Sequence, residues 1–456
     1  MSTEPDSSLA VPARLIHPAR GPLRGSIELP GSKSLTQRAM VLAALAQGRS
    51  TIANALEADD PRHLAAALGG LGVAIERGEA GMLTIEGTGG VFDGGVRLDL
   101  GEGATGARFS LALATLAAAP VVVDGGSRLR ERPMEEGVAM LRSLGASLRE
   151  LAAPGRLPIE VQGGGLRGGS IEAGRTASSQ FLSAVLLAAP ATQQGVDLQL
   201  QLDRGESPTS ASYLWLTIEA LREAGVRVEL DRELPRAGSD SAGPSRIRIA
   251  PQPIRSRTWA IEPDASTAIF FAVAAAIVPG STIELAGLPI ESSQPDAEAI
   301  RRMRSFGVEL AQGDRGILVR GAARLVGADL DASPFPDAVP ALAVLASRAE
   351  TPTMLRGLET LRIKESDRIE SVAENLRRAG VMVETGPDWL RIEPGGTVPG
   401  GPCLVDTCRD HRIAMAFAML GLARPGVAIA EPEVVAKSDP GFWARLERLG
   451  EGQVTG

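Results

Sequence analysis

The chain is poor in lysine, tyrosine, histidine and cysteine. Its 456 residues include one tyrosine, three histidines and two cysteines, and only three of its 47 basic residues are lysine. Two cysteines, Cys403 and Cys408, cannot build a disulfide framework, which favours a reducing, cytoplasmic location. Because the histidines are scattered and no Cys/His cluster is present, the sequence offers no metal site, and we expect no cofactor.

Long apolar runs and an excess of positive charge are also missing. The longest apolar stretches, such as "FFAVAAAIVP", have about half the length of a membrane-spanning helix. The net charge of −8 disfavours binding to nucleic acids or anionic membranes. Residues 1–14 lack the basic and apolar regions of a signal peptide, so we expect a disordered tail there. These absences favour a globular protein, which we expect to be a monomer acting on small molecules.

The three lysines contrast with an arginine-rich background. They are Lys33, Lys364 and Lys437, and every other basic position holds arginine. Lysine carries a compact, titratable ammonium group, whereas arginine presents a planar fork of donors. The retained lysines indicate positions where an ammonium group is needed, although chance retention explains any single one equally well.

A pattern of amphipathic helix, glycine and strand recurs along the chain. Examples are "LRSLGASLR" and "LREAGVRVEL", and a truncated copy, "LERLGEG", lies near the end. The repeated glycines, spaced 70 to 82 residues apart, are Gly72, Gly145, Gly225, Gly307, Gly380 and Gly450. A glycine at this place fits the left-handed turn that ends a helix. The pattern therefore predicts six similar units.

A second helix, rich in alanine and apolar on nearly every face, also recurs six times. The expected ranges are 34–46, 105–118, 179–189, 266–278, 338–347 and 411–422. A helix that is apolar all round lies inside a protein. We therefore predict an α/β (α+β) fold of two similar domains, each with three βαβαββ-like units, buried helices and outer sheets, as in an inside-out barrel.

A spacer near residues 235–262 separates the six units into two groups of three. The predicted N-terminal domain spans residues 32–254, and the C-terminal domain combines residues 15–31 with 255–456. The chain would then cross between domains near Gly31 and near residue 255. We expect the active site in the cleft between the domains.

Small or polar residues precede each buried helix. The six lead-in sequences are "GSKS", "GEGAT", "TASSQ", "PDAST", "PFPDAV" and "CRDHR". Free N–H groups and the helix dipole attract anions at such positions, although simple N-capping explains any one of them. Helices bundled with their N-termini towards a cleft predict an anion-binding site.

Seven short motifs lie along residues 30–442. They are "PGSKSLTQR", "RLRERP", "ASSQF", "PDA", "RIKESDR", "DHR" and "AKSDPGF". In order and spacing they closely resemble the enolpyruvyl transferases of the shikimate pathway, over roughly residues 20–450. The resemblance implies an enzyme that transfers the enolpyruvyl group of phosphoenolpyruvate to the 5-hydroxyl of shikimate 3-phosphate and releases phosphate, in aromatic amino-acid biosynthesis.

The implied reaction needs one group that removes a proton from the acceptor hydroxyl and one that protonates the enol methylene. By resemblance, Asp337 is the base and Glu365 a proton donor, with Lys33 and Lys437 around the tetrahedral adduct. Asp337 could instead only cap a helix, and Lys437 could be an ordinary exposed cation. For His411, a capping or positioning role is as well supported as proton transfer.

Two phosphates and two carboxylates enter one cleft, so several cations must converge there. The resemblance assigns shikimate 3-phosphate binding to Lys33, Ser34, Arg38, Ser178, Ser179, Gln180, Ser210, Tyr213, Asp337 and Lys364. It assigns phosphoenolpyruvate binding to Lys33, Ala104, Arg132, Gln180, Arg368, Arg412 and Lys437. Within "RIKESDR", Lys364 and Arg368 are expected to face one cleft with Glu365 between them, whereas Asp367 supports the start of the next helix.

The chain departs from the family pattern at three positions. Glu102 stands where members usually have asparagine, Ala104 where they have glycine, and Thr360 where many have asparagine. Ala104 adds a methyl group beside the phosphoenolpyruvate pocket, where the herbicide glyphosate also binds. We therefore expect an enzyme that glyphosate inhibits weakly.

Two alternatives share the expected fold. One is the sister enzyme that transfers enolpyruvate to UDP-N-acetylglucosamine, whose mobile loop carries a reactive cysteine; the corresponding stretch here, "GGSRLRERP", has none. The other is a noncatalytic relative that binds anions or RNA ends, which the acidic net charge and the intact Asp337, Glu365 and Lys437 disfavour.

Overall fold

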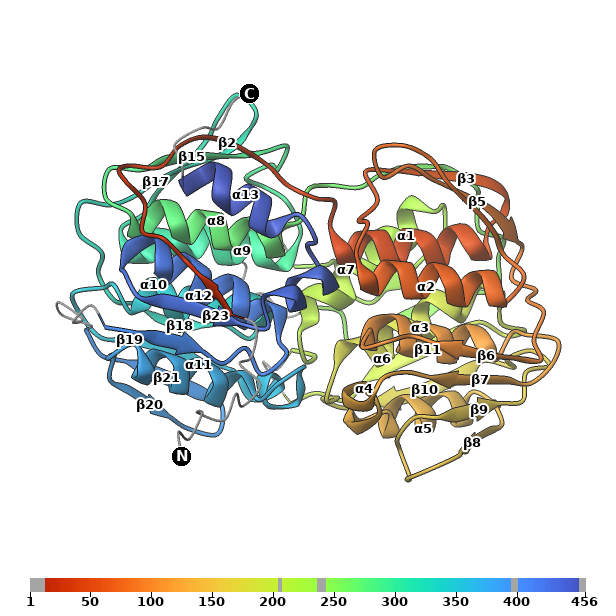
Figure 1. Cartoon of the computed structure of the whole chain (residues 1–456). Coiled ribbons are helices and arrows are strands. Elements are labelled where there is room, and N and C mark those ends of the chain that lie inside the picture. Colours follow the sequence, from red (N-terminus) through yellow and green to blue (C-terminus); the bar gives the residue numbers. More distant parts are fainter. Residues whose placement is uncertain (1–12, 204–206, 236–242, 395–400, 451–456) are drawn as a thin grey trace, which may run out of the picture.

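The computed structural model describes residues 13–203, 207–235, 243–394 and 401–450, which form two halves side by side (Figure 1). Most of the predicted tail, residues 1–12, lies outside the described residues. Ala13 and Arg14 are not tail, because they belong to strand β1 (Ala13–Leu15), which pairs antiparallel with β23 (Val427–Ala430). Among the helices of the described ranges, none has the length and apolar character that crossing a bilayer requires.

Each half contains three units, and the second unit shows their shared plan. Its elements are β6 (Val96–Asp99), α3 (Ala104–Ala114), β7 (Val121–Asp124), α4 (Ser127–Glu131), α5 (Glu135–Ser143), β8 (Leu148–Glu150) and β9 (Ile159–Val161). Strands β6 and β7 are parallel, β9 pairs antiparallel with β7, and β8 pairs antiparallel with β9. Apart from the short extra helix α4, this is the predicted βαβαββ unit.

The other units of the first half follow the same plan. The first unit consists of α1 (Lys33–Leu45), β3 (Gln47–Ala53), α2 (Asp59–Gly70), β4 (Ala74–Arg77), β5 (Leu83–Thr88) and β14 (Thr258–Ala260). The third consists of β10 (Gly169–Ala173), α6 (Ser179–Ala188), the 3-10 turn η1 (Ala189–Ala191), β11 (Val196–Leu200), α7 (Ala211–Glu223), β12 (Glu229–Leu230) and β13 (Arg246–Ile249).

In the second half the fourth and fifth units repeat the plan, whereas the described part of the sixth unit ends with its second helix and has no final hairpin. The fourth unit consists of β2 (Arg24–Glu28), α8 (Ala265–Ile277), β15 (Thr282–Ala286), α9 (Pro295–Arg302), η2 (Met303–Phe306), β16 (Glu309–Gln312) and β17 (Gly316–Arg320). The fifth consists of β18 (Asp329–Asp331), η3 (Pro336–Ala338), α10 (Val339–Ala346), β19 (Thr353–Arg356), η4 (Glu359–Ile363), α11 (Arg368–Arg378), β20 (Val383–Thr385) and β21 (Trp389–Ile392). The sixth consists of β22 (Cys403–Val405), α12 (His411–Ala423), β23, η5 (Pro432–Lys437) and α13 (Phe442–Gly450), and β1 joins its sheet.

Two strands join sheets that are distant in sequence. The first unit takes β14 as its parallel partner for β3, and the fourth takes β2 as the partner for β15. The two crossing segments bridge each other at Gly31 and Pro263. The second crossing therefore follows residue 261 and not residue 255, because Trp259 and Ile261 pack in the core of the first half.

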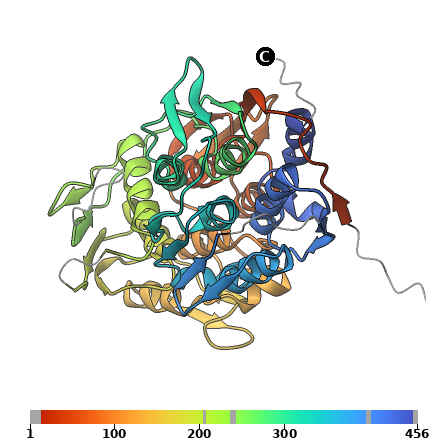
Figure 2. The same ribbon diagram turned by 90° about the vertical axis from the view of Figure 1, so that its left-hand side faces the viewer.

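Each half has its own apolar core around its alanine-rich helices. Helices α1, α3 and α6 lie in one core, and α8, α10 and α12 lie in the other. Figure 2 turns the second half towards the viewer, with its helices nearly end-on and its strands towards the outside. Each of the six sheets is an open ladder in the described part of the chain. The predicted arrangement of buried helices and outer sheets is therefore confirmed, but none of the described sheets closes into a barrel.

Five of the six repeated glycines adopt the predicted left-handed conformation, whereas the sixth, Gly450, is the last residue of α13. The φ angles of Gly72, Gly145, Gly225, Gly307 and Gly380 lie between 81° and 97°. Each of these glycines follows a helix and turns the chain towards the final hairpin of its unit. A side chain with a Cβ rarely adopts this conformation, which explains glycine at these positions.

Candidate active site

One pocket lies between the two halves and collects polar side chains from both. It is lined by Lys33, Ser34, Arg38, Asp60, Ala104, Thr105, Arg132, Ser178, Ser179, Gln180, Ser210, Tyr213, Asp337, Lys364, Glu365, Arg368, His411 and Arg412. Of the predicted site residues, Lys437 alone is outside this lining, and its Nζ lies 2.9 Å from Glu365 Oε1. The structure therefore brings all the predicted site residues together.

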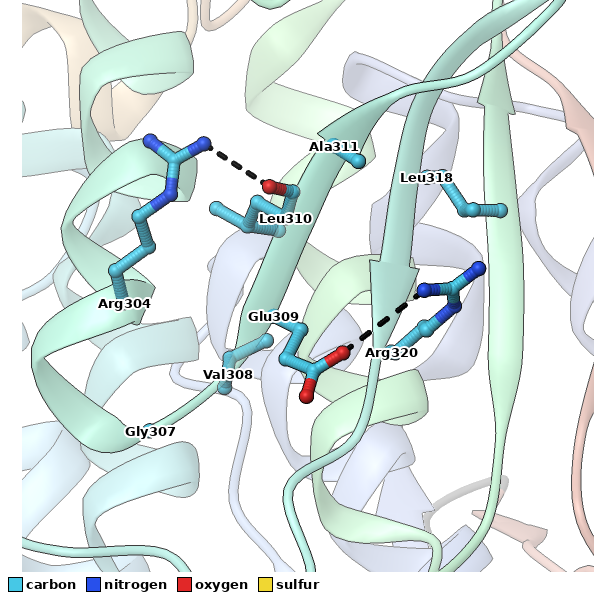
Figure 3. A pocket seen from close by; sticks show the side chains of 8 residues that line it. All are labelled: Arg304, Gly307, Val308, Glu309, Leu310, Ala311, Leu318 and Arg320. Carbon is cyan, nitrogen blue, oxygen red and sulfur yellow. Dashed lines mark hydrogen bonds and ion pairs between the residues drawn. The ribbon is translucent and has the colours of Figure 1, made fainter.

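A second hollow lies on the outer surface beside β16 and β17 (Figure 3). Arg304 donates a hydrogen bond to the Leu310 carbonyl there, and Arg320 pairs with Glu309 at 3.9 Å. This hollow contains none of the predicted site residues, and its three charged side chains already interact with other groups that line it. The pocket between the halves is therefore the better candidate for catalysis.

Helix N-termini point several lining residues at the pocket, as the lead-in sequences predict. Lys33, Ala104, Ser179 and His411 are the first residues of α1, α3, α6 and α12. Asp337 lies in η3, immediately before α10. The helix dipoles and free N–H groups at these ends favour bound anions.

All three lysines lie at this site, each beside a carboxylate. Lys33 Nζ is 2.9 Å from Asp60 Oδ2, and Lys364 Nζ is 3.5 Å from Asp337 Oδ1. Burial lowers the pKa of Lys364, whereas at Lys437 the carboxylate of Glu365 outweighs burial and raises the pKa. The pocket walls thus carry both charges, and substrate anions would compete with these carboxylates for the cations.

Arg368 holds the carboxylates of the second half together. Its guanidinium lies 2.8 Å from Asp337 Oδ1, 2.9 Å from Glu365 Oε2 and 2.7 Å from Asp410 Oδ2. Arg412 NH2 lies 2.9 Å from Asp337 Oδ2. Burial alone would raise the pKa of Asp337, but Arg412, Lys364 and Arg368 outweigh it and hold the pKa well below its ordinary value. Asp337 is therefore ionised, and the same cations weaken it as a proton acceptor until substrate anions share them.

Glu365 lies between cations from both halves. Besides Arg368 and Lys437, Arg132 of the first half approaches its carboxylate to 3.8 Å. Burial would raise the pKa of Glu365, but Lys437, Arg368 and Arg132 hold it well below the ordinary value. To donate a proton, Glu365 must first gain one, which requires substrate anions to share these cations.

Arg38 is tied to its own half. Its side chain donates to Thr217 Oγ1 at 2.8 Å and to the carbonyls of Ser34 and Tyr213 at 3.0 and 2.9 Å. Burial lowers its pKa to about 10. In this arrangement Arg38 holds the backbone that carries Ser34 and Tyr213, an arrangement that the sequence resemblance did not suggest.

The helix starts beside the charged motifs are capped by aspartates. The side chain of Asp367 accepts hydrogen bonds from the N–H groups of Ile369 and Glu370, which confirms its predicted helix-starting role. Asp410 accepts one from the Arg412 N–H, so Asp410 and not His411 caps α12. His411 is buried, and burial, with Lys33 and Arg412, holds its pKa well below 6.5, so the ring is neutral.

Sequence reasoning missed Asp60 and Arg108. Arg108 is buried and donates to Gln180 Oε1 at 2.5 Å and to Ser178 Oγ at 3.2 Å, so it orients two predicted contacts of shikimate 3-phosphate. A lone arginine inside an otherwise apolar helix is a signal that could have identified it. Asp60 is the second residue of α2, in "ADDPRH", where an acidic residue is ordinary at a helix start and gives no sign of the pairing with Lys33.

The two polar departures from the family pattern have different surroundings. The carboxylate of Glu102 accepts the backbone N–H of Leu129 at 2.8 Å, so it holds the start of α4. The hydroxyl of Thr360 is buried and has no hydrogen-bond partner within the described ranges. No group of three or more potential metal ligands is found among the residues that the structure describes.

Comparison with known proteins agrees with this geometry. The family model described as EPSP synthase (3-phosphoshikimate 1-carboxyvinyltransferase) matches residues 18–446. The 3-phosphoshikimate 1-carboxyvinyltransferase of Methanoculleus marisnigri is 38% identical over 95% of this chain and 98% of its own, and that of Nostoc punctiforme is 35% identical over 94% and 97%. The structure of EPSP synthase from Acinetobacter baumannii matches with a TM-score of 0.77 at 27% identity, over 96% of this chain and 98% of that one. The chain therefore belongs to the EPSP synthase (3-phosphoshikimate 1-carboxyvinyltransferase) family.

Proposed function

We propose that the pocket between the halves carries out the reaction of this family. The enolpyruvyl group of phosphoenolpyruvate is transferred to the 5-hydroxyl of shikimate 3-phosphate, and inorganic phosphate leaves. The observation that carries the proposal is the convergence of Lys33, Asp337, Glu365 and Lys437 from both halves on one pocket. The family membership favours this acceptor over UDP-N-acetylglucosamine and over a noncatalytic anion- or RNA-binding role.

The proposed steps follow from the charges on the site. Asp337, ionised beside Arg412, takes the proton of the acceptor hydroxyl while the hydroxyl oxygen bonds to C2 of phosphoenolpyruvate. Glu365 delivers a proton to the enol methylene, which gives a tetrahedral adduct. Glu365 then takes a proton back from the methyl group as the C–O bond to phosphate breaks, which restores the double bond, and the proton held by Asp337 leaves with the phosphate. Lys33 and Lys437 stabilise the charges around the adduct.

We propose two binding regions within the pocket. Shikimate 3-phosphate would contact Lys33, Ser34, Arg38, Ser178, Ser179, Gln180, Ser210, Tyr213, Asp337 and Lys364, mainly on the first half. Phosphoenolpyruvate would contact Lys33, Ala104, Arg132, Gln180, Arg368, Arg412 and Lys437, which bridge both halves. We also propose a cytoplasmic monomer divided into two domains, since one chain supplies every residue of this site.

Phosphate release tests the proposal. With phosphoenolpyruvate and shikimate 3-phosphate the protein is expected to release one phosphate for each acceptor consumed. UDP-N-acetylglucosamine in place of shikimate 3-phosphate is expected to give none. Two results would overturn the proposal. One is phosphate release from phosphoenolpyruvate with UDP-N-acetylglucosamine but not with shikimate 3-phosphate, and the other is no release with either acceptor.

A further inference from the structure

Helix α4 connects the two halves at the residues proposed for proton transfer. Arg128 lies in α4, on the first half. Its Nε donates to the backbone carbonyl of Glu365 at 2.7 Å, and its NH2 donates to that of Lys364 at 3.2 Å. These carbonyls lie between η4 and α11, so they are outside any helical hydrogen-bond ladder. One guanidinium therefore fixes the backbone of two site residues on the opposite half.

The N-terminal end of α4 is fixed by hydrogen bonds to residues 101 and 102. Glu102 accepts the Leu129 N–H at 2.8 Å, and the N–H of Gly126 donates to the Gly101 carbonyl at 2.7 Å. A Cβ at Gly126 would lie 2.0 Å from Glu102 Oε1, so a larger residue there would displace the Glu102 carboxylate from this position. Glu102, which replaces the asparagine usual in the family, thus fixes the start of the helix that presents Arg128.

A second contact crosses the pocket in the opposite direction. Lys437 of the second half donates to the Glu102 carbonyl at 2.9 Å and to Glu365 Oε1 at 2.9 Å. Glu365 is therefore held at its backbone by Arg128 and at its carboxylate by Lys437. The contacts of Arg128 with Glu365 and of Lys437 with Glu102 need the two halves to lie together, whereas Lys437 and Glu365 belong to the same half.

We propose that Arg128 is a positioning residue that aligns Lys364 and Glu365 when the halves come together. On the second half it touches backbone atoms only, its ion pair with Glu131 stays within α4, and it has no role in proton transfer. The inference rests on the proposed role of Glu365. A displacement of about 1 Å at a reacting group can cost about a hundredfold in rate, so loss of this contact should appear in turnover.

Arg130 provides a matched control on the same helix. Its guanidinium donates to Asp124 at 2.8 and 2.7 Å, within the first half. The side chains of Arg128 and Arg130 are 43% and 49% exposed, so methionine at either position removes one cation of similar exposure. Only Arg128→Met removes hydrogen bonds to the other half.

Steady-state kinetics and thermal unfolding of the full-length variants test the inference. Arg128→Met is expected to lower kcat about ten- to a hundredfold, with a smaller change in the KM for shikimate 3-phosphate. Its unfolding temperature should equal that of Arg130→Met. Arg130→Met should keep kcat within about twofold of the native enzyme, and Arg128→Lys, with one donor group, should fall between.

Equal kcat values for Arg128→Met and Arg130→Met would overturn the inference. The inference would also fail if Arg128→Met lost kcat and unfolded at a lower temperature than Arg130→Met, since that result indicates a merely structural role. A Glu365→Gln enzyme assayed in parallel separates the two claims. If it is inactive while Arg128→Met and Arg130→Met turn over alike, the role of Arg128 fails and the proposed function stands.

Discussion

Ala104 is the first residue of α3, is buried, and lines the pocket where we propose that phosphoenolpyruvate binds. Glyphosate is longer than phosphoenolpyruvate, so the alanine methyl group should crowd the inhibitor more than the substrate. Overpacking of this kind costs about 1–3 kcal/mol, or roughly 5- to 150-fold in affinity. We predict that Ala104→Gly increases glyphosate sensitivity by such a factor. An inhibition constant unchanged by the substitution would show the steric argument to be wrong.

Asp296 provides a pH-dependent prediction at the same scale. Burial, opposed by Arg412 but supported by Asp337 and Asp264, raises its pKa from 3.8 to about 7. The folded chain therefore keeps a proton that the unfolded chain loses above about pH 4. The resulting stabilisation is complete below that pH and is lost as the pH rises through about 7.

The test compares the native protein with Asp296→Asn, whose amide does not titrate. The native free energy of unfolding, measured relative to that of the variant, should decrease between pH 4 and pH 7. A difference that stays constant over this range would contradict the raised pKa.

Single residues show where sequence reasoning succeeds. The three lysines were identifiable because they are rare and lie in motifs, and all three lie at the pocket or beside it. The partners of Arg38 were not predictable, since Thr217 and Tyr213 are 179 and 175 residues away in the chain. Side-chain direction at a motif depends on such distant contacts, which a local pattern does not contain.

At the scale of elements, the glycine that follows each amphipathic helix can be tested against a helical glycine. Gly307 has φ 89°, and a Cβ there would lie 3.3 Å from the Arg324 carbonyl oxygen. Alanine in this conformation costs roughly 1–2 kcal/mol. Gly69 is the last residue but one of α2, where a Cβ would meet nothing within 4 Å beyond its own stretch of helix, and alanine there should gain up to about 0.5–1 kcal/mol.

Chemical denaturation of Gly307→Ala and Gly69→Ala measures both effects. The first should unfold at lower denaturant concentration than the native protein and the second at the same or higher concentration. If both variants lose stability alike, backbone conformation is not the reason for glycine at the repeated position.

The buried helices were predictable to within a few residues, because an all-apolar helix is a local signal. For example, 179–189 was expected for α6, which spans Ser179–Ala188. The joining of β14 to β3 and of β2 to β15 was not predictable in detail, since strand partners are set by packing across the molecule. The same reason explains why β1 completes the last sheet and why the crossing follows residue 261.

At the scale of the whole molecule, charged and polar groups connect the two halves at several points. Arg175 pairs with Glu359, and the Ser212 hydroxyl donates to the Pro334 carbonyl at 2.5 Å, besides the contacts of Arg128 and Lys437. Anions placed between the halves should draw them together. We predict that shikimate 3-phosphate reduces the radius of gyration in small-angle scattering, whereas shikimate without its phosphate does not. Identical radii in all three samples would count against closure.

We propose that Glu365, held between Lys437, Arg368 and Arg132, transfers a proton to the enolpyruvyl group. Phosphate release by Glu365→Gln, with saturating phosphoenolpyruvate and shikimate 3-phosphate, tests it most directly. Glutamine keeps the shape of the side chain but cannot exchange the proton. We expect a turnover at least about a hundredfold below that of the native enzyme, with substrate binding retained. A Glu365→Gln enzyme with near-native turnover would contradict it.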